Sequence, residues 1–382
     1  MNHLKSAPIR PHPLSPAVGL LLAAATAANA QTWPSVQGVC GDADLSGLAA
    51  RVYVADPGKD RDGCGSTFAD PCATIAVGIA RCAGRDRCGV LVGYGVYRLS
   101  APIALADGVG VYGGCLPPNQ ADPRYTSVIL APPQPPDRPD QAPSVRVIAI
   151  TARGIKQPTL LYGFQVFGSD WRIDQPNVMQ ASPATTAMSV YASPGLVLDQ
   201  VQLIGAQGGN GIAGRSADGS GCGGQCGGAD ASQCGSGGQA SPDVWGRMTW
   251  SVWQPSRGTD GAAAPDCPDH GARGGQQGGP SFALLLWDSS IVARRLTVCG
   301  GRGGPGGGGG NGGTGPGGGA GGGNGGPAVG VALVGDSRLG GEDIVDFAGV
   351  GGTGGQGGAA GAGGGARGQD GETGGVAATH RY

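Results

Sequence analysis

The side chains that most often perform acid–base and nucleophilic chemistry are scarce in this sequence. After residue 30 the only histidines are His270 and His380. No Gly-x-Ser-x-Gly sequence is present to hold a serine on a sharp turn between a strand and a helix. Because a Ser-His-Asp site needs both of these residues in place, we predict no catalytic triad.

One acidic sequence has the first half of a calcium-binding loop. Asp42, Asp44 and Ser46 supply oxygen atoms at alternating positions before Gly47, but the twelfth position is Tyr53, where a bidentate glutamate is needed. We interpret these residues as a polar turn and predict no metal site. A structural calcium ion is the alternative.

Eleven cysteines divide into an early and a late group. The groups are Cys40, Cys64, Cys72, Cys82, Cys88 and Cys115, then Cys222, Cys226, Cys234, Cys267 and Cys299. In an exported chain we expect disulfides, with the early group paired within itself and the unpaired thiol in the late group. Zinc is the rival, but no Cys-x-x-Cys pair occurs and His270 is the only histidine near the late group.

Three tryptophans lie among the late cysteines, at Trp245, Trp250 and Trp253. They indicate either a small disulfide-tied core beneath a loop or a surface on which sugar rings stack. We favour the small core, and we keep the three residues as a candidate ligand surface.

The first thirty residues have the pattern of a signal peptide. Lys5 and Arg10 precede an apolar run at 17–28, and Ala28-Asn29-Ala30 fits a cleavage site that leaves Gln31 first. We therefore expect export to the cell surface, the extracellular space or the periplasm. No later segment is apolar for long enough to span a bilayer, so we expect no transmembrane segment after cleavage. The net charge of −2 argues against a nucleic-acid partner.

Short β-prone runs separated by Gly, Pro or Asp predict strands through residues 51–168, with a short helix within Ala73–Cys82. An internal repeat then aligns segments 189–209, 284–304 and 332–352, which are offset by 95 and 48 residues. Three apolar positions coincide in this alignment: Val190, Leu285 and Leu333; Leu196, Ile291 and Leu339; and Val201, Leu296 and Ile344. A unit this short cannot bury its apolar side alone, so we expect the units to stack as coils.

Between the repeats lie tracts with glycine at every third residue and Gly-Gly-X as the dominant triplet, from Gly300 to Gly321 and from Gly349 to Gly364. Collagen is excluded because proline is scarce in the other positions. Two interpretations stay open. The tracts are flexible loops, or they form left-handed helices with three residues per turn that pack side by side.

Residues 52–114 resemble a known family. YVADPGKDRDGCGSTFADPCATI, VLVGYGVYRL and IALADGVGVYGG are similar to the opening coils of pectate-lyase-like right-handed β-helix proteins, and TLLYGFQVFG at 159–168 is similar to a later coil. The Gly-Gly-X tracts resemble those of glycine-rich bacterial surface proteins. The aspartate clusters and Gly-His-Gly of pectin hydrolases are absent. Arg153 and Lys156 have the spacing of a lyase base site but no acidic partner motif, which favours a solvated turn.

We therefore expect an all-β protein, a single right-handed parallel β-helix with an N-terminal cap and long glycine-rich loop insertions. The expected organisation is a signal peptide at 1–30, a leader at 31–50, N-terminal coils at 51–204, a Gly/Cys/Trp-rich loop at 205–280, a coil at 281–299, a Gly-Gly-X loop at 300–327, a coil at 328–347 and a Gly-rich tail at 348–382. The expected function is structural or adhesive, presenting the loops to a glycan, matrix or cell-surface partner, with no catalytic residue and no cofactor. The alternative is a carbohydrate-active enzyme on the same fold. The sequence does not indicate an oligomeric state.

Overall fold

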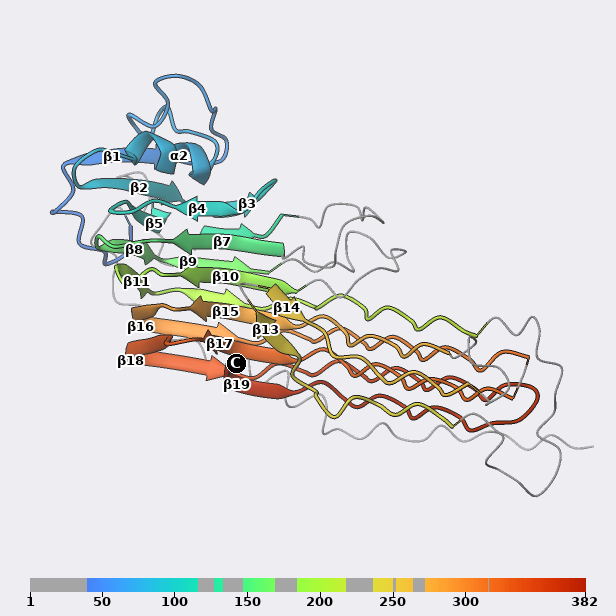
Figure 1. Ribbon diagram of the computed structural model, residues 1–382. Helices are drawn as coiled ribbons and strands as arrows, with labels where there is room; N and C mark the ends of the chain where they lie inside the picture. Colours follow the sequence, from blue (N-terminus) through green and yellow to red (C-terminus); the bar gives the residue numbers. More distant parts are fainter. Residues whose placement is uncertain are drawn as a thin grey trace, which may run out of the picture.

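The computed structural model describes residues 40–115, 127–132, 147–168, 184–217, 236–249, 252–263, 272–314 and 316–382. Their regular secondary structure consists of strands, nearly all in parallel sheets, and one helix (Figure 1). The predicted all-β class is confirmed. The signal peptide expected at 1–30 lies outside the described residues.

Two parallel sheets build the stack of strands on the left of Figure 1. The 11-stranded sheet contains β1 (Ala50–Val54), β2 (Cys88–Gly93), β3 (Gly95–Arg98), β5 (Gly110–Cys115), β6 (Ser127–Leu130), β8 (Thr159–Tyr162), β9 (Phe164–Phe167), β11 (Leu196–Asp199), β12 (Gln202–Ile204), β16 (Ser290–Cys299) and β18 (Arg338–Phe347). The 6-stranded sheet contains β4 (Ile103–Leu105), β7 (Val147–Arg153), β10 (Thr185–Tyr191), β15 (Ser281–Trp287), β17 (Ala328–Val334) and β19 (Val376–Arg381). A continuous apolar core lies between them.

The strand register confirms two of the three repeat positions. Ile291 pairs with Leu339 and Leu296 pairs with Ile344, as the alignment predicts. The third position is wrong by one residue, because Val190 and Leu333 both pair with Leu286 rather than with Leu285. Ser193 and Ser289 occupy equivalent places at the bend. Two residues, Pro194 and Gly195, separate Ser193 from Leu196, whereas Ser290 alone separates Ser289 from Ile291. The register therefore slips before this bend and agrees after it.

The bends of successive coils adopt the same backbone conformation. Non-glycine residues with positive φ, Gln200, Arg295 and Asp343, follow one another at one bend, with φ between 47° and 53°. At another bend Ser193 donates its N–H to the Ser289 hydroxyl, and Ser289 donates to Ser337 in the same way. These bends turn the chain so that each strand lies on its equivalent in the preceding coil.

The N-terminal end of the stack is closed by helix α2 (Ile75–Cys82) and three disulfides. Thr74 caps the helix by accepting a hydrogen bond from the Val77 N–H, which is why the helix begins two residues later than Ala73. The disulfides join Cys40 to Cys115, Cys64 to Cys72 and Cys82 to Cys88. The prediction that the early cysteines pair among themselves is confirmed.

The other end of the stack finishes on charged residues. Ile129, Val166, Leu203 and Val298 form one buried column, and Asp346 occupies the next position on β18. Its carboxylate accepts a hydrogen bond from the Thr379 hydroxyl on β19. An inward carboxylate on an edge strand opposes pairing with a further strand, so this end is protected against edge-to-edge association. The sequence did not predict β19, which lies in the expected Gly-rich tail.

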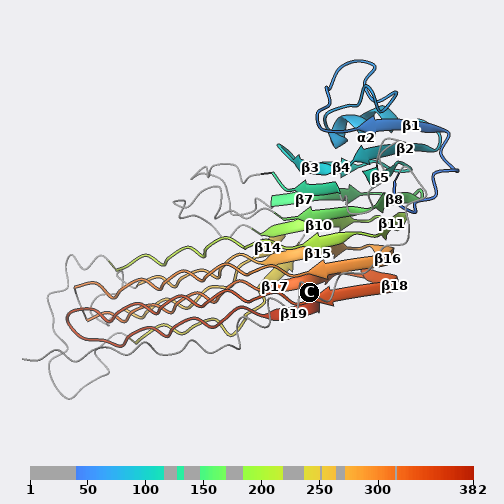
Figure 2. The ribbon, with the colours of Figure 1, turned by 180° about the vertical axis from the view of Figure 1, so that it is seen from behind.

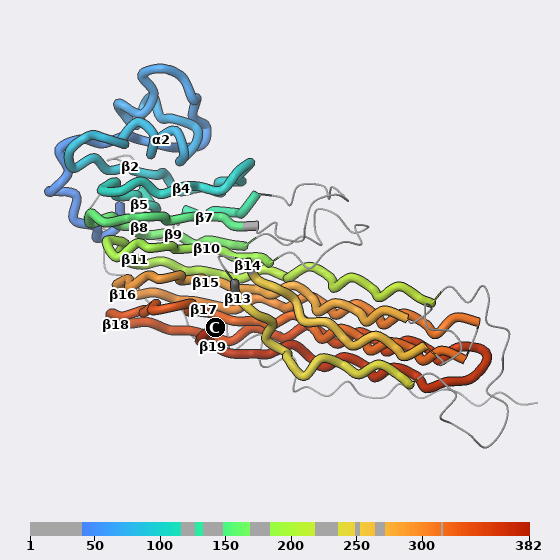
Figure 3. The backbone as a smooth tube through the Cα atoms, in the orientation of Figure 1, coloured from blue at the N-terminus to red at the C-terminus, as the bar shows by residue number. Residues whose placement is uncertain are grey.

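The glycine-rich tracts leave the stack as a bundle of extended segments lying side by side (Figures 2 and 3). Neighbouring segments exchange backbone hydrogen bonds at every third residue, as three residues per turn require. Gly303, Gly306 and Gly309 donate in turn to the carbonyls of Val350, Thr353 and Gln356. Of the two interpretations that the sequence left open, ordered segments packed side by side with a three-residue period hold for the described residues, and the left-handed twist stays a prediction.

Segment 316–327 is the buried axis of this bundle. It exchanges backbone hydrogen bonds with six neighbours, namely 236–241, 256–263, 272–279, 301–312, 349–360 and 365–375. Glycine is needed because the neighbouring backbones leave no space for a side chain. A Cβ built on Gly303 would lie 1.7 Å from the Gly326 carbonyl oxygen, and one on Gly325 would lie 1.7 Å from that of Gly352.

Candidate functional site

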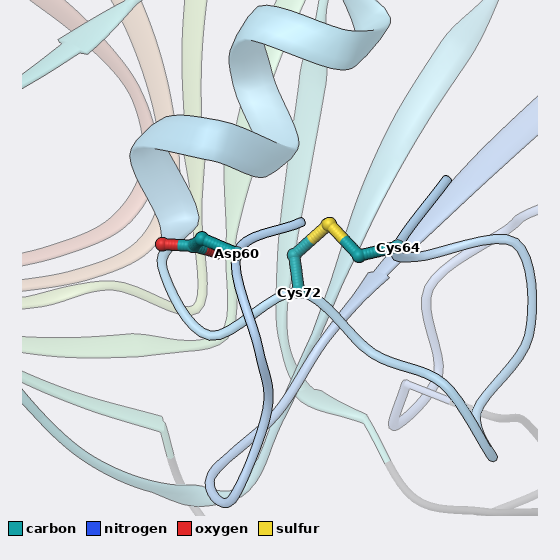
Figure 4. Close-up of side chains that lie close together, drawn as sticks. All are labelled: Asp60, Cys64 and Cys72. Atoms are coloured by element: carbon teal, nitrogen blue, oxygen red, sulfur yellow. A yellow bond between two sulfur atoms is a disulfide. The ribbon is translucent and has the colours of Figure 1, made fainter. Parts of the chain in front are cut away.

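One group of residues has the composition of a metal site but is occupied by other bonds. Asp60, Cys64 and Cys72 lie together beside the start of α2 (Figure 4). The two sulfur atoms form a disulfide, so neither is a thiolate that could bind a metal ion. The Asp60 carboxylate accepts hydrogen bonds from the Ala73 and Thr74 N–H groups and from the Thr74 hydroxyl. This cluster therefore ties the capping loop to the helix.

The acidic turn considered for calcium contacts the protein itself. The Asp42 carboxylate accepts hydrogen bonds from Tyr162 and Gln200, and Arg295 forms an ion pair with it at 2.8 Å. The Asp44 carboxylate accepts the Ser46 N–H at 2.9 Å, which is the hydrogen bond of a local turn. A calcium ion would have to displace the Arg295 guanidinium, so these contacts match the polar turn better than the calcium loop.

Arg295 forms ion pairs with two carboxylates, those of Asp42 and Asp199, each at 2.8 Å. It donates to the two Asp199 oxygens from Nε and Nη2, each at 2.9 Å. Burial acts to raise the pKa of Asp42, but the hydrogen bonds from Tyr162 and Arg295 outweigh it, and the pKa is lowered overall. A general acid of glycoside hydrolysis needs a raised pKa, so this carboxylate does not fit that role. The cluster holds the leader against the middle coils.

Arg153 and Lys156, which have the spacing of a lyase base site, contact different residues. The Arg153 guanidinium lies 5.2 Å from the centre of the Tyr191 ring. Lys156 donates its backbone N–H to Asp107 at 2.7 Å, and its side chain is exposed. This arrangement is that of a surface turn.

Of the late cysteines, only Cys299 lies in the described part of the chain. It is a half-buried free thiol, and burial raises its pKa. Since the thiolate is the reactive form, this thiol is a poor nucleophile. Cys222, Cys226, Cys234 and Cys267 fall outside the described residues, as does His270, so their pairing and the zinc alternative stay predictions.

Two of the three tryptophans pack on the outer face of the 6-stranded sheet. Trp253 is on β14 (Val252–Gln254), which pairs with β13 (Arg247–Thr249), and it is 4% exposed beside Phe282. Trp245 is half-buried, with its ring stacked 3.9 Å from that of His380 on β19. Trp250 lies outside the described residues. The small core is formed here by packing on the sheet, and the ligand surface remains a prediction.

Two fully buried side chains fasten this hairpin region to the bundle. The Gln277 amide donates to the carbonyls of Val244 and Gly325, and the Asn324 amide donates to those of Ser241 and Asp243. Both residues are 0% exposed. Because buried amides require partners, these contacts fix segment 241–244, just before β13, to the bundle.

One side of the bundle is a regular surface formed by segments 206–217, 301–312 and 349–360. We call it the Gly-Gly-X face. Its register is set by the parallel bridges of Gln207 to Arg302 and of Arg302 to Val350. The X residues therefore form four rows: Gln207, Arg302 and Val350; Asn210, Pro305 and Thr353; Ala213, Gly308 and Gln356; and Ser216, Asn311 and Ala359.

In the row furthest from the stack, side-chain oxygens satisfy backbone donors of the neighbouring segment. The Ser216 hydroxyl accepts the Asn311 N–H at 3.1 Å, and the Asn311 amide oxygen accepts the Ala359 N–H at 2.8 Å. Asn324 does the same inside the bundle for the Glu372 N–H, at 2.9 Å. In each case a side-chain oxygen of one segment accepts the backbone N–H of an X residue on the neighbouring segment.

The two middle rows lack such acceptors. Thr353 lies beside Pro305 and Gln356 lies beside Gly308, and neither neighbour has a polar side chain. Within the described residues, the N–H groups of Thr353, Gln356 and Gly308 have no acceptor. The Asn210 side-chain oxygen is buried without a donor, because Pro305, its neighbour in the row, has no N–H to give. The middle of the face therefore presents unpaired backbone donors.

Sequence reasoning did not identify this surface, although the triplet phase contains the signal for it. Glycine at every third residue marks the positions in contact, and the X residues mark the exposed side. Gly308 lies beside Gln356 because segment 301–312 pairs with segment 349–360, 48 residues further along the chain. Neither glycine-rich tract alone indicates this pairing. Comparisons with family models, curated proteins and solved structures found no match to this chain.

Proposed function

We propose that this chain is an exported adhesive or structural protein that holds a rigid polyglycine bundle out to a glycan, matrix or cell-surface partner. The carrying observation is the Gly-Gly-X face, a regular surface of small and polar side chains fixed by backbone hydrogen bonds. A surface that is already ordered loses little conformational entropy on binding, which favours affinity.

The supporting part, in this proposal, is a right-handed parallel β-helix of the pectate-lyase-like kind. Parallel pairing of equivalent strands supports it, as do the sequence likeness at 52–114 and the capping helix. Insertions leave successive coils at the same bend, after β12, β16 and β18, which places the glycine-rich segments side by side.

Export is proposed from the signal-peptide pattern and the disulfides. Three disulfides within 76 residues (40 to 115) are typical of chains that fold in an oxidising compartment. In the part of the chain that the structure describes, no helix is long and apolar enough to span a membrane.

Binding through the face is tested with charge substitutions. We would compare the mature protein with the double variant Thr353→Glu/Gln356→Glu on a glycan array and on intact cells. The matched control, Thr373→Glu/Gln369→Glu, changes the same residue types at exposed positions of segment 365–375, outside the face. Loss of binding in the first variant alone supports the proposal. Binding unchanged in both, or absent from the unmodified protein on every surface, overturns it.

Turnover of polysaccharides separates the enzyme alternative from binding. The same preparation is incubated with uronic-acid polymers with and without calcium, and reducing ends are measured. Robust turnover would replace the adhesive proposal with the carbohydrate-active enzyme.

A further inference from the structure

We propose that the strip of surface where segments 301–312 and 349–360 meet, called the seam below, binds the acetamido groups of an N-acetylhexosamine polymer. This inference rests on the proposed function and names the ligand class of the same face. Two consecutive N–H groups at the seam, those of Thr353 and Gln356, have no acceptor in the part of the chain that the structure describes. One turn of three residues separates them, which is about 9 Å at a rise of about 3.1 Å per residue.

The direction of these N–H groups follows from their neighbours in the triplet phase. The Val350 N–H donates to the Gly301 carbonyl, and the Ala359 N–H donates to the Asn311 amide oxygen. Both acceptors belong to segment 301–312. Since three residues complete a turn, the N–H groups of Thr353 and Gln356 face the same segment.

The protein itself shows which acceptor chemistry fits the N–H groups of this seam. One turn further along, the acceptor is a neutral amide oxygen, that of Asn311. Two carboxylates in the bundle also accept backbone N–H groups, and each is neutralised by an arginine. Asp260 accepts the Gly274 N–H and pairs with Arg257. Asp370 accepts the Gly357 N–H and pairs with Arg367. No described cation lies in the rows of Thr353 and Gln356, so a neutral amide is favoured over an anion.

An acetamido group matches the remaining features of the two middle rows. Its carbonyl oxygen takes the place that the Asn311 oxygen has in the last row, and its methyl group has Pro305 as an apolar neighbour. The space above Gly308 is open, because a Cβ there would have only the Gln356 carbonyl oxygen within 4 Å, at 3.5 Å. A polymer is favoured over a peptide because the donors repeat once per turn, whereas an extended peptide relies on pockets for alternate side chains.

The test places the protein's own kind of acceptor at the seam. In Gly308→Asn the new amide oxygen lies in the position relative to Gln356 that Asn311 has relative to Ala359. The control is Gly340→Asn on β18, where no atom lies within 4 Å of the built Cβ. Binding of oligomers of N-acetylglucosamine and of β-1,4-linked glucose is measured by calorimetry on the full mature chain. Slower amide exchange of Gln356 verifies that its N–H has gained this acceptor.

We expect the N-acetylglucosamine oligomer to bind and the glucose oligomer to bind at least tenfold more weakly. The affinity of Gly308→Asn for the N-acetylglucosamine oligomer should fall at least tenfold, whereas that of Gly340→Asn should not change. Pro305→Asn, which offers an acceptor to Thr353, should weaken binding in the same way. Three results overturn this inference and leave the proposed function standing. They are equal affinity for both oligomers, unchanged affinity in Gly308→Asn when the Gln356 amide is protected, and preference for an extended peptide. Failure to bind any glycan, matrix or cell surface overturns both.

Discussion

Replacing a glycine at the axis of the bundle should be far more damaging than replacing one on the Gly-Gly-X face. A Cβ on Gly323 would lie 2.0 Å from the Gln276 carbonyl oxygen, and ordinary contact begins at 3.4 Å. Backbone must therefore move by about 1.4 Å (3.4 minus 2.0). Overpacking of this kind costs about 1–3 kcal/mol.

Movement at Gly323 also strains two backbone hydrogen bonds, from its N–H to Gly307 and from the Gly355 N–H to its carbonyl, each 2.8 Å long. At about 0.5–1.5 kcal/mol each, they bring the expected loss for Gly323→Ala to about 2–6 kcal/mol. Gly308→Ala should instead stabilise the protein by about 0.4–1 kcal/mol, because the site is open and alanine restricts the unfolded chain.

Equilibrium denaturation of both variants measures the difference directly, with circular dichroism and tryptophan fluorescence as probes. Opposite signs are expected. If the two variants have the same free energy of unfolding, the segments are not packed as described, and the close approach of their backbones is refuted.

The remaining predictions concern the stack. Leu296→Ala should cost about 2–5 kcal/mol because its side chain is fully buried, and Ile344→Ala should cost less because it is half-buried; equal costs in denaturant titrations would contradict the stacked core. Burial lowers the pKa of His380, so as pH falls this histidine is protonated in the unfolded state before the folded state, and thermal stability should fall below about pH 6.5. A melting temperature that does not change with pH, or the same pH dependence in His380→Phe, would contradict this. Arg295→Ala leaves Asp199 without its ion pair and should cost about 1–2 kcal/mol, discounted for partial exposure; no loss of stability would show that the cluster is not a brace.

Much of the stack follows from patterns within short windows of sequence. Apolar positions predicted that Ile291 lies beside Leu339 and that Leu296 lies beside Ile344, because these residues follow a bend with the same number of residues in both units. The error at Val190 arose because an alignment without gaps cannot show that Pro194-Gly195 replaces a single residue at the bend. The strand β19 was missed because its alternation follows a long glycine tract.

The bundle was the part that sequence alone could not decide. Gly-Gly-X triplets suit a flexible chain and a packed helix equally well, since glycine permits both. The difference lies in lateral partners distant in sequence, such as Gly303 beside Gly326 and Gly352. The tryptophans were harder to place for the same reason, because Trp253 and Trp245 pack on strands that the loop composition does not indicate.

Residue-resolved amide exchange in the glycine tracts is the most direct measurement of the ordered bundle and its unpaired donors. Hydrogen-bonded N–H groups, among them those of Gly304, Gly307 and Gly310, should be protected, whereas Gly308 and Gln356 should exchange rapidly within the same segments. Protection that is interrupted only at the unpaired donors is the expected result. Uniformly fast exchange through residues 301–327 would contradict a packed bundle, and with it the face proposed for binding.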